Sequence, residues 1–202
     1  MNVTIEKYNG SIIGELSYVI VEAMQTNPLH LVAFGAPAEK SRNMQIELFS
    51  LLLGMPSCNL FIARIEEQIV GVMNYYLPGK CQLSPIKTLS LFPRLSSILG
   101  YQLIPVLRWK KTWARQDPKA VHLHFGPLAV LPGFQGKGIG SAMLSHFCEY
   151  ADGLNLLSYL ETDKEENVSL YKRFGFRILH TVILLGVTNW FMFRPPQTFE
   201  PQ

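Results

Sequence analysis

Charged residues and cysteines are scarce in this sequence, and each shortage excludes a class of protein. Charged residues make up only 16% of the 202 residues, whereas hydrophobic residues make up 48%. This composition excludes a disordered chain and a coiled coil, and supplies enough apolar material for a single domain over 1–202. The cysteines Cys58, Cys81 and Cys148 are far apart and odd in number, so they form neither a disulfide framework nor a CxxC motif. We therefore expect a reducing, cytoplasmic compartment.

The sequence also lacks a targeting segment, a long apolar run and a strong charge of either sign. Residues 1–8 have neither the basic start nor the apolar run of a signal peptide. The most apolar stretch, 178–193, is broken by polar residues before it reaches the roughly 18 apolar residues that a membrane span requires. Lysine and arginine number 18 and aspartate and glutamate 15, a net charge of +3. We therefore expect neither a membrane nor a nucleic-acid partner.

Strand and helix patterns alternate along the chain. Period-two alternation and short apolar runs predict strands over 3–8, 60–65, 69–76, 122–130, 156–161, 176–185 and 188–194. Helical spacing of apolar residues predicts helices over 12–24, 38–53, 141–150 and 167–174. Prolines punctuate residues 80–119, but about forty residues without structure would be unusual, so we expect helices at 95–103 and 106–115. The alternation predicts a mixed α/β (α+β) domain.

A glycine-rich loop lies between the predicted strand 122–130 and the predicted helix 141–150. It reads Gln135-Gly136-Lys137-Gly138-Ile139-Gly140. Glycines let the backbone approach an anion, and the first N–H groups of the following helix have no intrahelical partner. The helix dipole and Lys137 add favourable charge, so a phosphate or pyrophosphate is the natural ligand.

Three other interpretations of this loop compete. A Walker loop fails because Leu131 stands where its first glycine belongs and Gly138 follows the lysine. A dinucleotide fingerprint would use Glu161 as its acidic residue, but the spacing is GxGxG, and too little chain follows to build the parallel strands. A glycine-rich turn without a ligand is the third interpretation when the loop is considered alone.

Two segments together resemble the GNAT superfamily of N-acetyltransferases. Residues 126–140 resemble its acetyl-CoA-binding motif, Ala-Val followed by turn residues and Gln/Arg-x-x-Gly-x-Gly/Ala, here Gln135, Gly138 and Gly140. Residues 160–176 read Leu-Glu-Thr-Asp and then, after three residues, Asn-Val-Ser-Leu-Tyr-Lys-Arg-Phe-Gly-Phe, which is similar to the next motif of the family. Order and spacing both match, which is far more specific than one glycine loop.

The resemblance is clearest over 120–194 and extends to the hairpin 60–76 and the helices before it. Residues 80–119 have no counterpart and are interpreted as a helical insertion. The resemblance implies an acyl-CoA N-acyltransferase fold, a mixed, mostly antiparallel sheet of about seven strands flanked by helices. It also implies acetyl-CoA (coenzyme A) as donor co-substrate and direct transfer to a primary amine of a small molecule or protein. The enzyme would be a monomer or a homodimer.

In the family pattern, backbone amides of the glycine loop bind the coenzyme A pyrophosphate, and the pantetheine arm runs beside the strand end like an extra strand. Pro127 fits this pattern because it has no N–H to donate and belongs at a bulge or free edge, although it equally fits the start of a strand. The residues expected to bind the co-substrate are Leu128, Ala129, Val130, Gln135, Gly136, Lys137, Gly138, Ile139, Gly140, Ser141, Asn167 and Tyr171.

The resemblance also implies catalytic residues. Tyr171 would be the acid near the sulfur, because a phenol of pKa about 10 can protonate a thiolate of pKa about 8.5; packing in a helix is the alternative role. His124 stands where histone-acetylating relatives carry their catalytic glutamate, and a histidine with a pKa near about 6.5 can accept the proton of the amine. His122 lies on the same face of the strand and Glu161 is a third candidate, so the base stays open. Asn167 would contact the pantetheine arm or cap a helix.

The remaining candidates concern the oxyanion, metals and the acceptor. By analogy, a strand N–H near Leu128 or Ala129 would meet the oxyanion, and Cys148 is interpreted as a core residue. We expect no metal, because His30, His146 and His180 lack metal-ligand spacing. The acceptor site is expected to come from segments 29–37, 69–76 and 80–119. The side chains that would line it, or else pack in the core, are Tyr75, Tyr76, Trp109 and Trp113.

Two other functions fit the same sequence. One is a non-catalytic module that binds or senses acyl-CoA, and the other is an acyltransferase that uses a longer acyl group. Lys110, Lys111 and Arg115 form a small basic cluster beside the tryptophans, which would hold a phosphate of coenzyme A or an acidic substrate, or form a solvated helix face.

Overall fold

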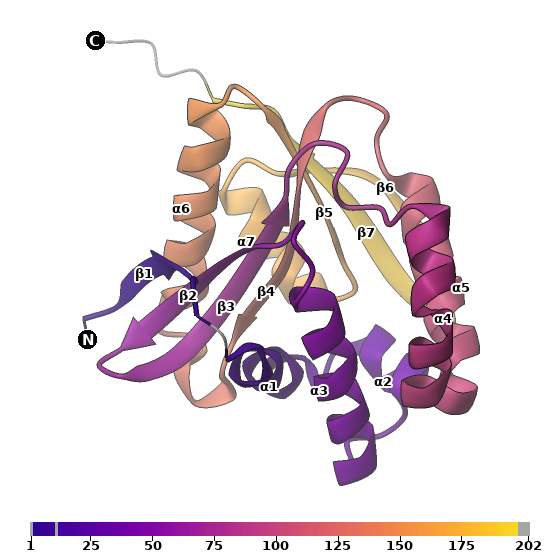
Figure 1. Ribbon diagram of the computed structural model, residues 1–202. Helices are drawn as coiled ribbons and strands as arrows, with labels where there is room; N and C mark the ends of the chain where they lie inside the picture. Colours follow the sequence, from indigo (N-terminus) through magenta and orange to yellow (C-terminus); the bar gives the residue numbers. More distant parts are fainter. Residues whose placement is uncertain (1, 11, 198–202) are drawn as a thin grey trace, which may run out of the picture.

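The computed structural model describes residues 2–10 and 12–197, and a sheet with helices on both faces lies at its centre (Figure 1). The strands are β1 (Thr4–Lys7), β2 (Asn59–Ile65), β3 (Gln68–Tyr76), β4 (His122–Val130), β5 (Leu157–Thr162), β6 (Arg177–Leu184) and β7 (Val187–Arg194). They form a seven-stranded sheet in the order β1-β2-β3-β4-β5-β7-β6. β4 and β5 run parallel and the other neighbours antiparallel, which confirms the expected fold.

The helices of the described residues cover the sheet and extend beyond one end of it. They are α1 (Ile13–Met24), α2 (Pro28–Phe34), α3 (Glu39–Leu53), α4 (Pro85–Leu99), α5 (Leu103–Gln116), α6 (Ile139–Gly153) and α7 (Glu165–Arg173), with short 3-10 turns at Gly100–Gln102 and Pro132–Phe134. Within the part of the chain that the structure describes, no helix has both the length and the apolarity needed to cross a membrane.

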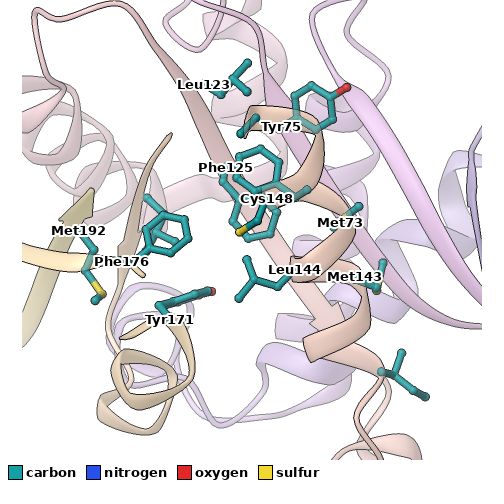
Figure 2. Close-up of a cluster of buried hydrophobic side chains, with 14 of the residues drawn as sticks. Met73, Tyr75, Leu123, Phe125, Met143, Leu144, Cys148, Tyr171, Phe176 and Met192 are labelled. Carbon is teal, nitrogen blue, oxygen red and sulfur yellow. The ribbon is translucent and has the colours of Figure 1, made fainter. Parts of the chain in front are cut away.

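The two faces of the sheet bury different side chains because successive strand residues point to opposite faces. Val72 of β3 belongs to a cluster with Leu16 of α1. Its neighbour Met73 belongs to a second cluster with Leu144 of α6, which Figure 2 shows. Cys148 lies in this second cluster, where burial raises the pKa of its thiol to about 11. The interpretation of Cys148 as a core residue is therefore confirmed.

The segment 80–119 is helical, as expected, but its first helix begins earlier than predicted. α4 begins at Pro85, where the side chain of Ser84 accepts a hydrogen bond from the backbone N–H of Lys87 at 3.2 Å. Proline is favourable at the first position of a helix because its missing N–H would have no partner there. Pro93 lies inside α4 on an exposed stretch, so it did not mark the boundary that the sequence suggested.

A short helix, α2, occupies residues that the sequence analysis left without a helix. Pro28 begins it and Gly35, with φ of 88°, ends it. The carboxylate of Asp163 accepts a hydrogen bond from the backbone N–H of Leu29 at 2.7 Å, so a distant residue stabilises its first turn. The pair Asn27-Pro28 follows the end of α1 at Met24 and begins α2, a role that the sequence analysis did not predict.

Candidate active site

The main cavity opens where β4 and β5 part. These parallel strands pair only over 122–124 of β4 and 157–159 of β5. The rest of β4, as far as Val130, pairs with β3 on its other side. A cavity of about 610 Å³ lies in the gap, and its wall includes residues 124–130 of β4 and 161–162 of β5. A parted pair of central strands can admit a ligand between them without breaking the rest of the sheet.

A bulge in β4 lies along this cavity. Leu128 faces Met73 and Phe125 faces Tyr75, so two residues of β4 oppose the single residue Asn74 of β3. One of these two is Pro127, which has no N–H to pair with β3. The side chain of Asn74 donates a hydrogen bond to the carbonyl oxygen of Gly126 at 3.2 Å. Pro127 therefore occupies a bulge within the strand and does not mark its start.

The bulged strand directs backbone groups into the gap. The N–H of Leu131 donates to the carbonyl oxygen of Val70 in β3 at 2.9 Å. Because N–H groups of successive strand residues point to opposite sides, those of Leu128 and Val130 point away from β3 and toward the cavity. The carbonyl oxygen of Val130 accepts a hydrogen bond from the side chain of Gln135 at 2.9 Å, which ties the glycine loop to the strand.

The glycine loop needs its glycines for backbone conformation. Gly136 and Gly138 have φ of 73° and 84°, a region that side chains disfavour. A Cβ at either position would meet no atom within 4 Å, so space is not the constraint. Gly138 precedes α6 without a side-chain cap, and the first N–H groups of α6 are therefore free of such a partner. These groups form an anion-binding end of a helix beside the cavity.

The cavity gathers nearly all of the residues predicted to bind the co-substrate. Those that line it are Leu128, Ala129, Val130, Gln135, Gly136, Gly138, Ile139, Gly140, Ser141, Asn167 and Tyr171. Lys137 is the exception, because its ammonium donates to the carbonyl oxygen of Gly133 at 2.9 Å and lies over the ring of Phe134. Its side chain braces the loop and lies outside the cavity wall.

The base candidates lie in one chain of carboxylates and imidazoles. Asp117 Oδ1, at the end of α5, is 3.1 Å from His122 Nε2 and 3.4 Å from His124 Nδ1. His124 Nε2 is 3.0 Å from Glu161 Oε2. His122 Nδ1 contacts the carbonyl oxygen of Ala120 at 2.7 Å. His124 and Glu161 line the cavity and His122 does not, which separates the two histidines that the sequence could not rank.

The carboxylates change the expected titration of His124. Burial lowers its pKa, but attraction to Glu161 and the hydrogen bond with Asp117 outweigh burial and raise this pKa well above 6.5. For Asp117, burial raises the pKa, and the hydrogen bonds with His122 and His124 reverse that effect and lower it. The expectation of a histidine that titrates near 6.5 is therefore wrong for His124, because its two carboxylate partners favour the imidazolium.

Asp117, His122 and His124 are the one group within residues 2–10 and 12–197 whose side chains could together hold a metal ion. Their ligand atoms lie within 4.8 Å of one another, and a set of one carboxylate and two imidazoles suits zinc. The hydrogen bonds given above already pair these atoms with one another. The sequence analysis did not consider this group, and its expectation of no metal stays a prediction.

Tyr171 and Asn167 project from α7 toward the cavity. Tyr171 is buried, and burial followed by the nearby charge of Asp163 raises the pKa of its phenol, so the hydroxyl keeps its proton at neutral pH. Asn167 donates a hydrogen bond to Thr162 Oγ1 at 3.4 Å. It lies inside α7, whose N-cap is Lys164, so its alternative role as a helix cap is wrong.

The acceptor candidates separate into two groups. Trp109 and Trp113 of the insertion line the cavity. Tyr75 instead packs with Phe147 on the α6 face, and Tyr76 contacts the ring of His124 from outside the cavity wall. His30 of the wall lies in the segment 29–37 that was expected to contribute to the acceptor site. Residues of the wall that the sequence analysis did not assign include Met24, Asn27, Phe49 and Asp163. These four residues belong to no motif that the sequence analysis used for the acceptor, so only the fold could have placed them there.

Comparison with known protein families matches residues 23–176 to the acetyltransferase (GNAT) family. The matched segment is more than half of the chain. It contains the glycine loop, the parting of β4 and β5, and Tyr171.

Several solved structures share the fold. One is described as histone acetyltransferase HPA2 and related acetyltransferase from Corynebacterium glutamicum, with 25% identity over all of both chains and a TM-score of 0.76. The ribosomal-protein-S18-alanine N-acetyltransferase from Escherichia coli is 12% identical over 100% of this chain and 99% of its own, with a TM-score of 0.57. The PaiA N-acetyltransferase from Thermoplasma acidophilum, in complex with coenzyme A, is 12% identical over 96% and 99%, with a TM-score of 0.59.

Proposed function

Because the chain belongs to the acetyltransferase (GNAT) family, we propose that it transfers an acetyl group from acetyl-CoA to a primary amine, with both substrates bound together. Acyl transfer from acyl-CoA is the activity of that family. The single observation that supports our finer proposal is the cavity between β4 and β5. It joins the glycine loop, the backbone of Leu128 and the pair of His124 and Glu161 in one space.

Donor binding relies on backbone groups. The first N–H groups of α6 and the positive-φ glycines Gly136 and Gly138 would hold the pyrophosphate, because both favour close approach of an anion. The pantetheine arm would pair with the β4 backbone at Leu128 and Val130, whose N–H groups have no strand beside them. This arrangement would place the thioester near the bulge.

The reaction has a simple balance. The amine nitrogen attacks the thioester carbonyl carbon and forms the C–N bond, and the C–S bond then breaks. The N–H of Leu128 points into the gap and would stabilise the oxyanion. His124 in its neutral form would take the proton that the amine releases, directly or through water, and Glu161 and Asp117 stabilise the imidazolium that results. Tyr171 would donate its proton to the departing thiolate and regain one from solvent.

The cavity wall carries charges of both signs. Glu161, Asp163 and Glu166 line it together with Lys164 and Arg173, and Asp163 is buried. A protonated amine would be attracted to these carboxylates and would lose its proton only in the site. This attraction would favour an amine acceptor over an alcohol, because an alcohol carries no charge.

The proposal is tested by two measurements on the purified chain. Calorimetry measures binding of coenzyme A, and a thiol assay measures coenzyme A release from acetyl-CoA with a panel of primary amines. We expect binding and amine-dependent release. Binding without release for every acceptor would favour a non-catalytic acyl-CoA-binding module. Faster release from a longer acyl-CoA would favour a different acyl group, and absence of binding would refute the enzyme.

A further inference from the structure

One part of the cavity wall is aromatic and is built from three helices. His30 comes from α2, Phe49 from α3, and Trp109 and Trp113 from α5. The rings contact one another: His30 lies 5.2 Å from Trp109 and 6.0 Å from Phe49 between centroids, and the two tryptophans lie 5.2 Å apart. We call these four side chains the aromatic wall.

One ring of the aromatic wall is oriented by a hydrogen bond, and the wall is not fully covered. The indole N–H of Trp113 donates to Asn189 Oδ1 at 2.9 Å, which fixes the orientation of this ring. Trp109, Trp113 and Phe49 are only half-buried, although they line a cavity and contact neighbouring rings. Partly exposed rings inside a cavity leave apolar surface that a flat ligand would cover.

The hydrogen bonds around His30 fix which of its nitrogens carries the proton. The carbonyl oxygen of Phe34 can only accept, so the single hydroxyl proton of Ser41 is donated to it at 3.1 Å. Ser41 Oγ must then accept from Gln45 Nε2, at 3.3 Å, which turns Gln45 Oε1 toward His30. His30 Nδ1 therefore donates to Gln45 Oε1 at 2.8 Å.

His30 consequently presents a hydrogen-bond acceptor. Burial lowers its pKa, and the opposing effects of Gln45 and Asp163 do not restore it, so the ring is neutral at physiological pH. With the proton on Nδ1, Nε2 carries a lone pair, and the hydrogen bond of this ring to Gln45 is made by Nδ1 and leaves that lone pair unused. The aromatic wall thus contains one uncharged acceptor atom.

Building on the proposed function, we infer that the aromatic wall binds the flat apolar body of the acceptor amine and that His30 Nε2 accepts a hydrogen bond from a hydroxyl or N–H on that body. The preferred acceptor is therefore an arylalkylamine with a donor group on its ring. A polyamine has no flat ring to stack on the aromatic wall, so we expect it to be a poorer acceptor.

The inference is tested by acetyl transfer to four amines of similar size: tyramine, phenethylamine, hexylamine and spermidine. We expect kcat/KM for phenethylamine to exceed that for hexylamine about tenfold, because the rings stack on a flat body. The ring hydroxyl of tyramine should add a further factor of about ten, because a site built to hydrogen-bond a hydroxyl discriminates against its absence.

Two substitutions separate the parts of the wall. Trp109→Ala should raise KM for phenethylamine about tenfold with kcat nearly unchanged, because it removes binding surface and no reacting group. His30→Phe keeps an aromatic ring and removes the acceptor, so tyramine should lose its advantage over phenethylamine. Phe92→Ala is the matched control, because Phe92 is an exposed aromatic side chain of α4 outside the cavity wall.

Several outcomes would overturn the inference. Equal or faster transfer to spermidine or hexylamine would do so, as would an unchanged preference for tyramine in a His30→Phe variant that still binds coenzyme A. If His30→Phe does not fold, Gln45→Leu serves instead, since it frees the Nδ1 proton and should weaken the tyramine preference. Transfer without any aromatic preference leaves the proposed function intact, whereas no transfer to any amine refutes both.

Discussion

At the scale of single residues, burial and charge determine which groups in the cavity hold a proton. His30 and His124 are both buried, yet their pKa values move in opposite directions. His30 faces rings and an amide, so burial dominates and the ring stays neutral. His124 lies between Asp117 and Glu161, so charge dominates and the imidazolium is favoured. The type of residue alone therefore does not predict its protonation.

The pH dependence of activity should reflect the raised pKa of His124. Because the proton is held above 6.5, the neutral base forms only as the pH rises through that higher value, so kcat/KM should still increase from pH 7 to 9. Glu161→Gln removes the charge that raises the pKa most, and should shift the rise to lower pH. The role of His124 as the base would be contradicted if kcat/KM no longer increased above pH 7, or if the pH profile were unchanged in His124→Gln.

The substitution Tyr171→Phe tests the proposed role of Tyr171 as the general acid that protonates the leaving thiolate. The substitution keeps the buried ring in its cluster and removes only the hydroxyl, so the fold and the binding of coenzyme A should be retained. Loss of a general acid should lower kcat about 100-fold. Stopped assays of coenzyme A release at saturating acetyl-CoA measure kcat, and calorimetry measures binding. Full activity of the variant would show that Tyr171 serves packing alone.

At the scale of elements, the start of α6 combines a glycine conformation with an anion site. Gly138→Ala places a side chain at φ of 84°, which should destabilise the protein by about 1 kcal/mol and weaken coenzyme A binding about tenfold. Gly133→Ala is the matched control, because it adds a methyl group in open space of the same loop without a positive φ. Equal binding by both variants would remove the anion-binding role of this turn.

The end of β7 is joined to α6 by a buried ion pair. Arg194 Nη1 and Nη2 lie 2.6 Å and 2.7 Å from the two oxygens of Asp152, and Arg194 Nε donates to the carbonyl oxygen of Phe174 at 2.7 Å. Arg194→Met leaves the Asp152 carboxylate without its partner and should lower the free energy of unfolding by about 3 kcal/mol. Urea denaturation at pH 7 measures this loss, and the exposed Arg177→Met serves as control.

The same pair has a predictable pH dependence. Burial raises the pKa of Asp152, but the hydrogen bonds with Arg194 outweigh it and lower this pKa below its value in the unfolded chain, about 3.9. Its contribution to stability is therefore present above that value and is lost as the pH falls through the lowered pKa. In Arg194→Met, the free energy of unfolding should therefore fall less steeply as the pH is lowered below about 4. An unchanged fall would show that other carboxylates cause it.

At the scale of the whole molecule, the cavity depends on segments that are far apart in the sequence. α2, α3 and α5 supply the aromatic wall, β4 and β5 supply the gap, and α6 and α7 supply residues that we propose bind the donor (Figure 1). Coenzyme A bound across them should stabilise the fold by about 2.7 kcal/mol at 100 times its Kd, seen as a rise in Tm. Gly138→Ala should show a smaller rise at the same concentration, and an equal rise would place the ligand elsewhere.

Much of the fold and the glycine loop of the candidate site was predictable from sequence because their signals are local. Strand alternation depends on neighbouring residues, and a glycine-rich turn before a helix has a conformation that few sequences adopt. Element ends were less predictable, as Pro93 inside α4 and Pro28 at the start of α2 show, because one proline can either begin or interrupt a helix.

The sequence by itself determined the fold class, the family resemblance and most of the predicted co-substrate residues that line the cavity, since each depends on short-range pattern. The tertiary structure alone decided that His124 and not His122 lines the cavity, that Asp117 and Glu161 hold its proton, and that His30 joins Trp109 across helices. The reason is physical. Protonation and acceptor shape depend on charges and rings brought together through space, and spacing along a chain does not encode their distance.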